Sequence, residues 1–125
     1  MKISSLLSTA LFMFLILCES IESPRLFCGV SNPVEELIWL KQKTEELKQT
    51  GLYETGQVYI WYTEYDGETY FIIDNCCPNC NSVLLIYNCM GEYVSANTTI
   101  SEYINSYDKD INNVIWNPEN FSCNL

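Results

Sequence analysis

Cysteine content constrains the fold of this chain more than any other feature. The sequence of 125 residues contains seven cysteines, and all but Cys18 lie beyond residue 27. So many cysteines in a short stretch are unusual in a reducing cytosol and common in exported proteins, where they form disulfides. The cysteines beyond residue 27 number six, and an even number allows every one of them to form a disulfide. The sequence does not choose among the possible pairings. We therefore predict a disulfide-stapled domain whose paired cysteines are Cys28, Cys76, Cys77, Cys80, Cys89 and Cys123.

The N-terminus also indicates export. A mostly apolar run over residues 6–18 follows Lys2. This run is shorter than the roughly 20 residues that a membrane-spanning helix needs, and it is typical of a signal peptide. We predict a signal peptide over residues 1–20. The alternative is a lipoprotein signal over residues 1–17, which would leave Cys18 lipidated. Both interpretations place the protein outside the cytoplasm, either secreted or lipid-anchored in the cell envelope.

Charge narrows the range of partners. The formal net charge is −10 at pH 7. A nucleic-acid-binding surface needs clustered Lys and Arg to contact phosphates, and docking on anionic lipid needs the same. We therefore expect no nucleic-acid partner, and contact with a membrane only through the possible lipid anchor at Cys18.

Local patterns predict the secondary structure. Residues 21–31 show no clear period and suggest a linker before a single domain over residues 32–125. Asn32 and Pro33 suit a helix start, and apolar residues at helical spacing predict one amphipathic helix over residues 33–49, with Gly51 as its stop. Residues 100–107 predict a short second helix, with capping-box spacing from Thr99 to Glu102.

Between the two helices, the pattern changes to that of strands. Residues 57–65 and 68–74 are rich in β-branched and aromatic residues, and Asp66-Gly67 between them is a strong hairpin signal. Residues 83–87 and 92–94 predict a second hairpin, and residues 111–116 a last short strand. We therefore predict an α+β fold, in which one N-terminal helix packs on a small antiparallel sheet of two hairpins and a short second helix follows.

Composition excludes several kinds of catalytic site. The chain has no histidine, which removes Ser-His-Asp and Cys-His sets and the H-E-x-x-H zinc motif. No glycine-rich phosphate loop or dinucleotide fingerprint is present, and we predict no cofactor and no metal. A catalytic pair of carboxylates, as in glycosidases, is still possible. A role in surface solubility, however, explains the presence of the acids of the first hairpin more simply. These acids are Glu64, Asp66, Glu68 and Asp74.

The segment from Cys76 to Cys80 allows three interpretations. Structural disulfides come first, because adjacent cysteines on extended backbone point to opposite faces and would bond different partners. Redox catalysis is the second, because Cys77-Pro78-Asn79-Cys80 looks like the C-P-x-C of glutaredoxin-type enzymes, although a strand rather than a helix is predicted to follow. Zinc bound by Cys77, Cys80, Cys89 and a fourth cysteine is the third, and it lacks a second C-x-x-C.

Aromatic residues of the first hairpin provide the candidate binding surface. One sheet face must cover the core, and the other is either covered by helices and termini or exposed as an aromatic surface. The exposed alternative makes Tyr59, Trp61, Tyr65 and Tyr70 candidate binding residues.

Several segments together resemble a known family. Residues 32–41 match an N-P-x-E-x-L-x-W-L-K opening, residues 65–74 a Tyr-rich hairpin, and residues 85–94 a later strand pair that follows the adjacent Cys76 and Cys77. In these features the chain resembles a family of small exported proteins, often lipoproteins, from Bacteroidetes, which is classed as a domain of unknown function. The resemblance covers residues 32–94, and residues 98–125 depart from the family's usual ending. It implies export and an envelope setting but no activity.

The sequence thus favours a non-catalytic binding module for an unknown protein or small ligand, monomeric and exported. The alternative function is that of a thiol–disulfide oxidoreductase that uses the C-P-x-C motif.

Overall fold

A two-stranded antiparallel hairpin forms the centre of the fold. The computed structural model describes residues 23–80 and 83–125, so the predicted signal sequence and Cys18 lie outside the described residues. Strands β1 (Val58–Tyr65) and β2 (Glu68–Asn75) pair over their full length. The turn residues Asp66 and Gly67 have φ values of 52° and 76°, as the two-residue turns that match strand twist require. The hairpin predicted from Asp66-Gly67 is confirmed.

Three short strands extend this hairpin into an antiparallel sheet. Strands β3 (Leu85–Tyr87) and β4 (Tyr93–Val94) form the second predicted hairpin beside β2. Strand β5 (Val114–Trp116) follows the 3₁₀ turn η1 (Ile111–Asn113) and pairs with β1. The strand order within the described residues is β4-β3-β2-β1-β5.

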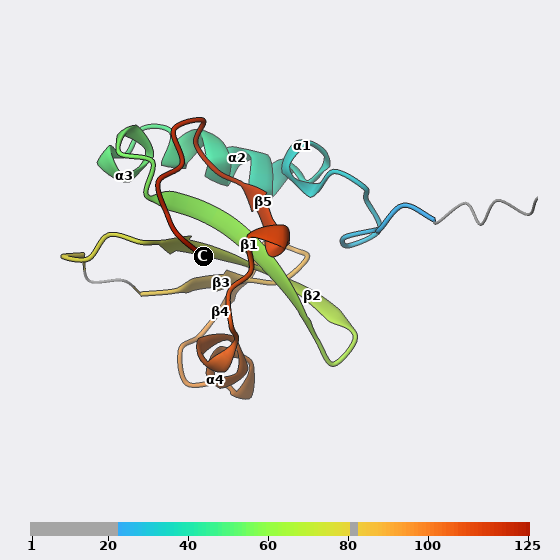
Figure 1. The fold of residues 1–125 in the computed structure, drawn as a ribbon. Coiled ribbons are helices and arrows are strands. Elements are labelled where there is room, and N and C mark those ends of the chain that lie inside the picture. Colours follow the sequence, from blue (N-terminus) through green and yellow to red (C-terminus); the bar gives the residue numbers. More distant parts are fainter. Residues whose placement is uncertain (1–22, 81–82) are drawn as a thin grey trace, which may run out of the picture.

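Helices cover both faces of the sheet (Figure 1). Helices α1 (Pro33–Glu36), α2 (Ile38–Leu47) and α3 (Gly51–Glu54) lie on one side. Helix α4 (Thr99–Ser106) lies on the other. The α+β class, the N-terminal helical layer and the short second helix are therefore confirmed.

The first helical segment differs from its prediction as one helix. Leu37 is extended, with φ −88° and ψ 110°, and separates α1 from α2. After this break, the α2 face directed at the sheet carries Leu40 and Thr44, four residues apart, while Ile38 is 78% exposed. Gly51, predicted as a helix stop, instead begins α3, and the Thr50 hydroxyl caps it by accepting from the Tyr53 amide. Tertiary packing of Leu37 and Leu40 thus overrides local helix propensity.

The second helix begins one residue earlier than predicted. Its capping box joins Thr98 and Ser101 rather than Thr99 and Glu102. The Thr98 hydroxyl accepts from the Ser101 amide, and the Ser101 hydroxyl accepts from the Thr98 amide, each at 3.3 Å. Serine can close the reciprocal pair as the glutamate of the usual motif does.

Alternation along β1 and β2 divides the core in two. The face toward α1–α3 buries an aliphatic and aromatic set with Leu40 of α2; its strand members are Val58, Ile60, Tyr62, Phe71 and Ile73. The face toward α4 buries Ile104 of α4; its strand members are Tyr59, Trp61, Tyr70, Ile72 and Ile86. Successive strand residues point to opposite faces, so the two eight-residue strands of this hairpin supply most of both cores.

All six cysteines of the described residues form disulfides. The pairs are Cys28–Cys89, Cys76–Cys123 and Cys77–Cys80, with Cα atoms 5.5, 5.7 and 5.4 Å apart. Adjacent Cys76 and Cys77 have different partners, as predicted. The pairs Cys28–Cys89 and Cys77–Cys80 use the thiolates that a zinc site would need, which contradicts the zinc interpretation.

The segment predicted as a linker joins the domain in its described part. Phe27 and Val30 form a backbone bridge, and the ring of Phe27 contacts that of Tyr62 at 4.6 Å between centroids. With Cys28 bonded to Cys89, residues 27–30 belong to the folded body. The domain therefore begins before residue 32, because this segment buries aromatic surface of its own.

Gly56 allows the C-terminal segment to approach the start of β1. Its φ is +72°, and an added Cβ would overlap the backbone carbonyl of Asn120. We expect Gly56→Ala to lower the free energy of unfolding by about 2 kcal/mol, through the left-handed backbone and the overlap together. Gly67→Ala is the matched control, because Gly67 also has positive φ but open space around it. Urea unfolding of both variants checks the prediction, and equal losses would contradict the proposed overlap.

Candidate functional site

The four predicted binding aromatics do not form an exposed surface. Tyr59, Trp61 and Tyr70 are 1%, 1% and 5% exposed, and Tyr65 is half-buried. Tyrosines of the α4 segment cover the strand residues: Tyr107 stacks on Trp61 at 5.8 Å, and Tyr103 contacts Tyr65 at 4.9 Å. The expectation of an exposed aromatic sheet face is therefore wrong, because the second helix and the C-terminal segment cover that face.

A buried carboxylate replaces that surface as the most distinctive feature of the α4 side. The Asp74 side chain is 2% exposed, and its Oδ2 lies 2.7 Å from Nζ of Lys109. The Tyr59 hydroxyl and Trp61 Nε1 donate to the same oxygen at 3.0 and 3.3 Å, and the Asn75 amide donates to Oδ1 at 2.8 Å. Register explains the cluster, since Tyr59 lies directly opposite Asp74 in the hairpin. We call Asp74, Tyr59, Trp61 and Lys109 the Asp74 cluster.

The Asp74 cluster predicts alkaline sensitivity. Burial first, and then the charge and hydrogen bond of Asp74, raise the pKa of Tyr59 above its usual value. The folded state therefore requires neutral Tyr59, whereas the unfolded chain releases its proton near pH 10. The contribution of Tyr59 to the free energy of unfolding should not change with pH below about pH 10. Above that pH, the free energy of unfolding should fall by up to about 1.4 kcal/mol per pH unit.

Denaturant unfolding between pH 8 and pH 11.5 measures this effect. Burial and the Glu68 hydrogen bond also raise the pKa of Tyr70, so part of the slope belongs to Tyr70. Tyr59→Phe should reduce the slope of the free energy of unfolding against pH and leave only the contribution of Tyr70. An unchanged slope in Tyr59→Phe would show that Tyr59 does not carry the effect.

The predicted carboxylates are separated by the hairpin. Glu64 and Glu68 lie near the turn, whereas Asp74 lies six residues beyond Glu68 along β2, or about 20 Å at strand rise. Asp74 therefore cannot act with Glu64 or Glu68 as a pair of the kind found in glycosidases, which needs separations of roughly 5–10 Å.

Glu64 and Glu68 instead border a groove at the turn end of the hairpin. The groove has a volume of about 520 Å³. Three segments line it: the N-terminal arm, the hairpin end and the β3–β4 turn. Its members are Leu26, Cys28, Glu64, Gly67, Glu68, Thr69, Asn88, Cys89 and Met90. We call it the hairpin groove. Sequence reasoning missed it, because the disulfide Cys28–Cys89 brings together segments that are 61 residues apart.

Hydrogen bonds and the Cys28–Cys89 disulfide hold the β3–β4 turn at this groove. The Asn88 side chain accepts from the Met90 and Glu92 amides at 2.9 and 3.0 Å. Trp39 Nε1 of α2 donates to the Cys89 carbonyl at 3.0 Å. Met90 is nevertheless 77% exposed, and Leu26 across the groove is 56% exposed. Two apolar side chains are thus held in solvent on an ordered frame.

The carboxylates of the groove already interact with neighbouring groups. Glu64 pairs with Arg25 at 3.5 Å, and the guanidinium of Arg25 lies over the Tyr62 ring at 4.9 Å. Glu68 accepts from the Tyr70 hydroxyl at 2.9 Å. This rim therefore holds one guanidinium between a carboxylate and a ring.

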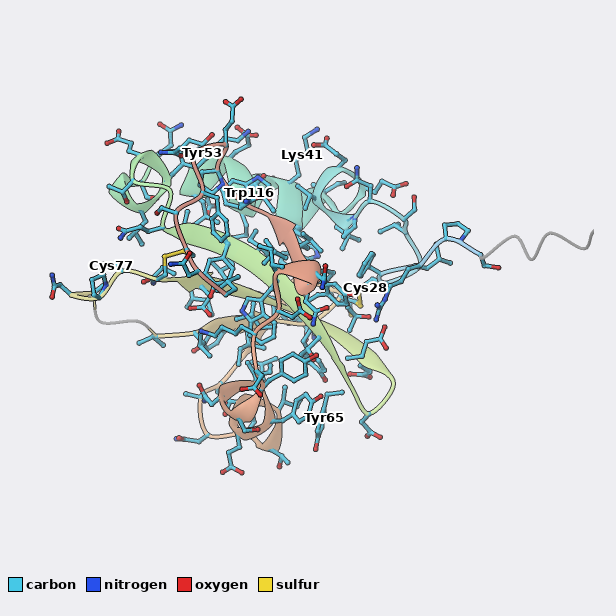
Figure 2. All side chains as sticks on the ribbon, in the orientation of Figure 1. Cys28, Lys41, Tyr53, Tyr65, Cys77 and Trp116 are labelled. Atoms are coloured by element: carbon cyan, nitrogen blue, oxygen red, sulfur yellow. A yellow bond between two sulfur atoms is a disulfide. The ribbon has the colours of Figure 1, made fainter. Side chains whose placement is uncertain are left out.

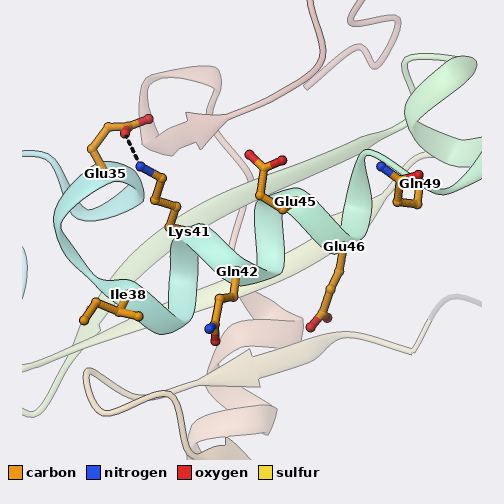
Figure 3. Close-up of a pocket in the computed structure, with 7 residues that line it drawn as sticks. All are labelled: Glu35, Ile38, Lys41, Gln42, Glu45, Glu46 and Gln49. Atoms are coloured by element: carbon orange, nitrogen blue, oxygen red, sulfur yellow. Dashed lines mark hydrogen bonds and ion pairs between the residues drawn. The ribbon is translucent and has the colours of Figure 1, made fainter.

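A second depression, of about 780 Å³, lies on the outer face of α2. Figure 3 shows its polar lining, with Lys41 Nζ 3.3 Å from Oε2 of Glu35 and with Gln42, Glu45 and Glu46 extending away from the helix axis. Ile38 is its one exposed large apolar residue. These features are those of a solvated helix face.

The Cys77–Cys80 pair lies far from the hairpin groove. Figure 2 places Cys77 and Cys28 at opposite ends of the molecule. Cys77 and Cys80 follow the end of β2 in a loop, and after residues 81–82 the described chain continues as loop and then β3. Among the described residues of this loop, the pair therefore lacks the helix start that lowers thiol pKa in glutaredoxin-type enzymes.

Within residues 23–80 and 83–125, no cluster of three or more potential metal ligands is found. Over the same residues, every helix is too short or too polar to cross a bilayer. No protein family, no curated protein and no solved structure matches this chain. The resemblance to exported Bacteroidetes proteins therefore stays a prediction from the sequence.

Proposed function

We propose that this chain is an exported, monomeric, non-catalytic binding domain that recognises another protein through the hairpin groove. Complete pairing of the described cysteines supports an oxidising location. The observation that carries the proposal is the exposure of Leu26 and Met90 beside two carboxylates on a disulfide-anchored frame. A fixed frame reduces the entropy cost of binding, since few side chains need ordering.

The chemistry of the groove favours a basic segment with an apolar neighbour. Glu64 and Glu68 supply two negative charges, of which Arg25 offsets one. The formal net charge of −10 attracts a basic partner over longer range. Arg25 already lies between Glu64 and the Tyr62 ring. An arginine of a partner could make contacts of the same kind at this rim. Leu26 and Met90 supply apolar area, and methionine adapts to varied shapes. An Arg or Lys next to a Leu, Met or Phe fits these features.

A displayed random heptapeptide library, selected on the oxidised domain, tests the proposal. The expected consensus contains Arg or Lys beside a large apolar residue. A synthetic consensus peptide should lose about tenfold in affinity for Glu64→Gln/Glu68→Gln, and binding should weaken as salt is raised. Glu45→Gln/Glu46→Gln on the outer face of α2 removes the same charge elsewhere and should change affinity little. A neutral or acidic consensus, or equal effects of the two double variants, would reject the groove.

Export and anchoring require a separate measurement. Intact mass of the protein from its native host, taken from membrane and soluble fractions, should show loss of residues 1–20 or a lipid on Cys18. Reduction should add about 6 Da for three disulfides. An uncleaved N-terminus would contradict export.

A further inference from the structure

Three disulfides of unequal accessibility hold this domain. Cys28 packs against the core beside α1–α3, and Cys123 against the core beside α4. Their pairs close sequence separations of 61 and 47 residues. Cys77–Cys80 closes a separation of only three residues. Opening that pair therefore releases almost no chain, whereas opening either of the others releases a whole segment.

Solvent reaches the short pair from the side of Cys80. Cys80, Pro78 and Asn79 are exposed, and Cys77 is half-buried. The loop beyond β2 is a turn in which the Cys80 amide donates to the Cys77 carbonyl at 3.4 Å and the Cys77 amide donates to Oδ1 of Asn75 at 3.2 Å. Disulfide exchange needs a thiolate to approach one sulfur from outside, and Cys80 is the more exposed residue of the pair.

We propose that Cys77–Cys80 is a redox-active disulfide that exchanges with thiols of the exported compartment while the other two pairs keep the fold intact. A thiolate attacks Sγ of Cys80 and forms a mixed disulfide, and the Sγ of Cys77 leaves as a thiolate. A second thiol attacks the sulfur of the first, which yields an external disulfide and frees Cys80. Two external thiols are thereby oxidised by two electrons, and Cys77 and Cys80 are reduced.

This inference does not depend on the hairpin groove, which lies at the other end of the molecule (Figure 2). It also differs from thioredoxin-type catalysis, because the described loop supplies no helix start to stabilise a thiolate. Accessibility and the small closed loop carry the inference instead, since exposed disulfides are the labile or regulatory ones.

A time course in a reducing glutathione buffer provides the test on the full mature domain. Free thiols are alkylated and assigned by peptide mapping, while near-UV circular dichroism follows the fold. Cys77 and Cys80 should be reduced about tenfold faster than the other four cysteines, with no change in the spectrum. Earlier opening of Cys28–Cys89 or Cys76–Cys123, or simultaneous opening of all three pairs, would overturn the proposal.

Single-cysteine variants test the direction of attack. Cys77→Ser leaves Cys80 as the exposed thiol and should form a mixed disulfide with oxidised glutathione faster than Cys80→Ser does through Cys77. Cys77→Ser/Cys80→Ser should show native circular dichroism and no thiols in the glutathione buffer that reduces Cys77 and Cys80 of the parent protein. Faster adduct formation at Cys77, or thiols in the double variant in that buffer, would contradict the assignment.

Discussion

Replacing Asp74 with alanine is expected to lower the free energy of unfolding by about 3–5 kcal/mol, because the change leaves buried donors without an acceptor. Oδ2 of Asp74 accepts from Tyr59 and Trp61, and both of these residues are 1% exposed. The carboxylate therefore satisfies two donors that are shielded from bulk solvent. The loss is large against the roughly 5–15 kcal/mol that stabilises a domain of this kind. Urea unfolding at pH 7, with all disulfides intact, measures it.

Two further variants separate the components of this loss. Lys109→Met removes the partly exposed charge but leaves Asp74 with the three neutral donors that satisfy its oxygens, so a smaller loss is expected. Glu64→Gln changes a carboxylate of the same hairpin whose ion pair with Arg25 is exposed, and it should cost no more than about 1 kcal/mol. Equal losses for Asp74→Ala and Glu64→Gln would show that the Asp74 cluster contributes no special stability.

The Asp74 cluster illustrates what sequence patterns could and could not predict. Alternation places Tyr70, Ile72 and Asp74 on one strand face, so an acid on a buried face was detectable. Its partner Lys109 comes from the segment after α4, and nothing local links the two. The burial of Trp61 was also inferable, because the apolar face of helix 100–107 needed a surface to cover.

Features that depend on one segment were predicted most closely. Asp66-Gly67 fixed the central hairpin because the turn type demands positive φ at both residues. The break at Leu37 escaped prediction because it depends on packing against the sheet. Disulfide partners and the hairpin groove escaped for the same reason, since both join segments far apart in the sequence.

Removal of the Cys28–Cys89 disulfide is the second change with a large expected effect. Cys28→Ala/Cys89→Ala should lower the free energy of unfolding by about 4 kcal/mol, because the bond closes a 61-residue separation and restricts the unfolded chain. The N-terminal arm would then be held mainly by Phe27 on Tyr62 and by the ion pair of Arg25 with Glu64. Guanidinium unfolding of the purified, otherwise oxidised variant measures the loss.

Cys77→Ala/Cys80→Ala is the control, because it removes a disulfide of the same chemistry that closes only three residues. Its expected loss is below about 2 kcal/mol on the same loop-entropy argument. The two double variants also differ at the hairpin groove. Only Cys28→Ala/Cys89→Ala detaches the segment that carries Leu26 from the β3–β4 turn. Only that variant should therefore weaken binding of the consensus peptide. Comparable stability losses would indicate that loop length does not determine what each disulfide contributes. Intact peptide affinity in Cys28→Ala/Cys89→Ala would show that the groove does not need its disulfide frame.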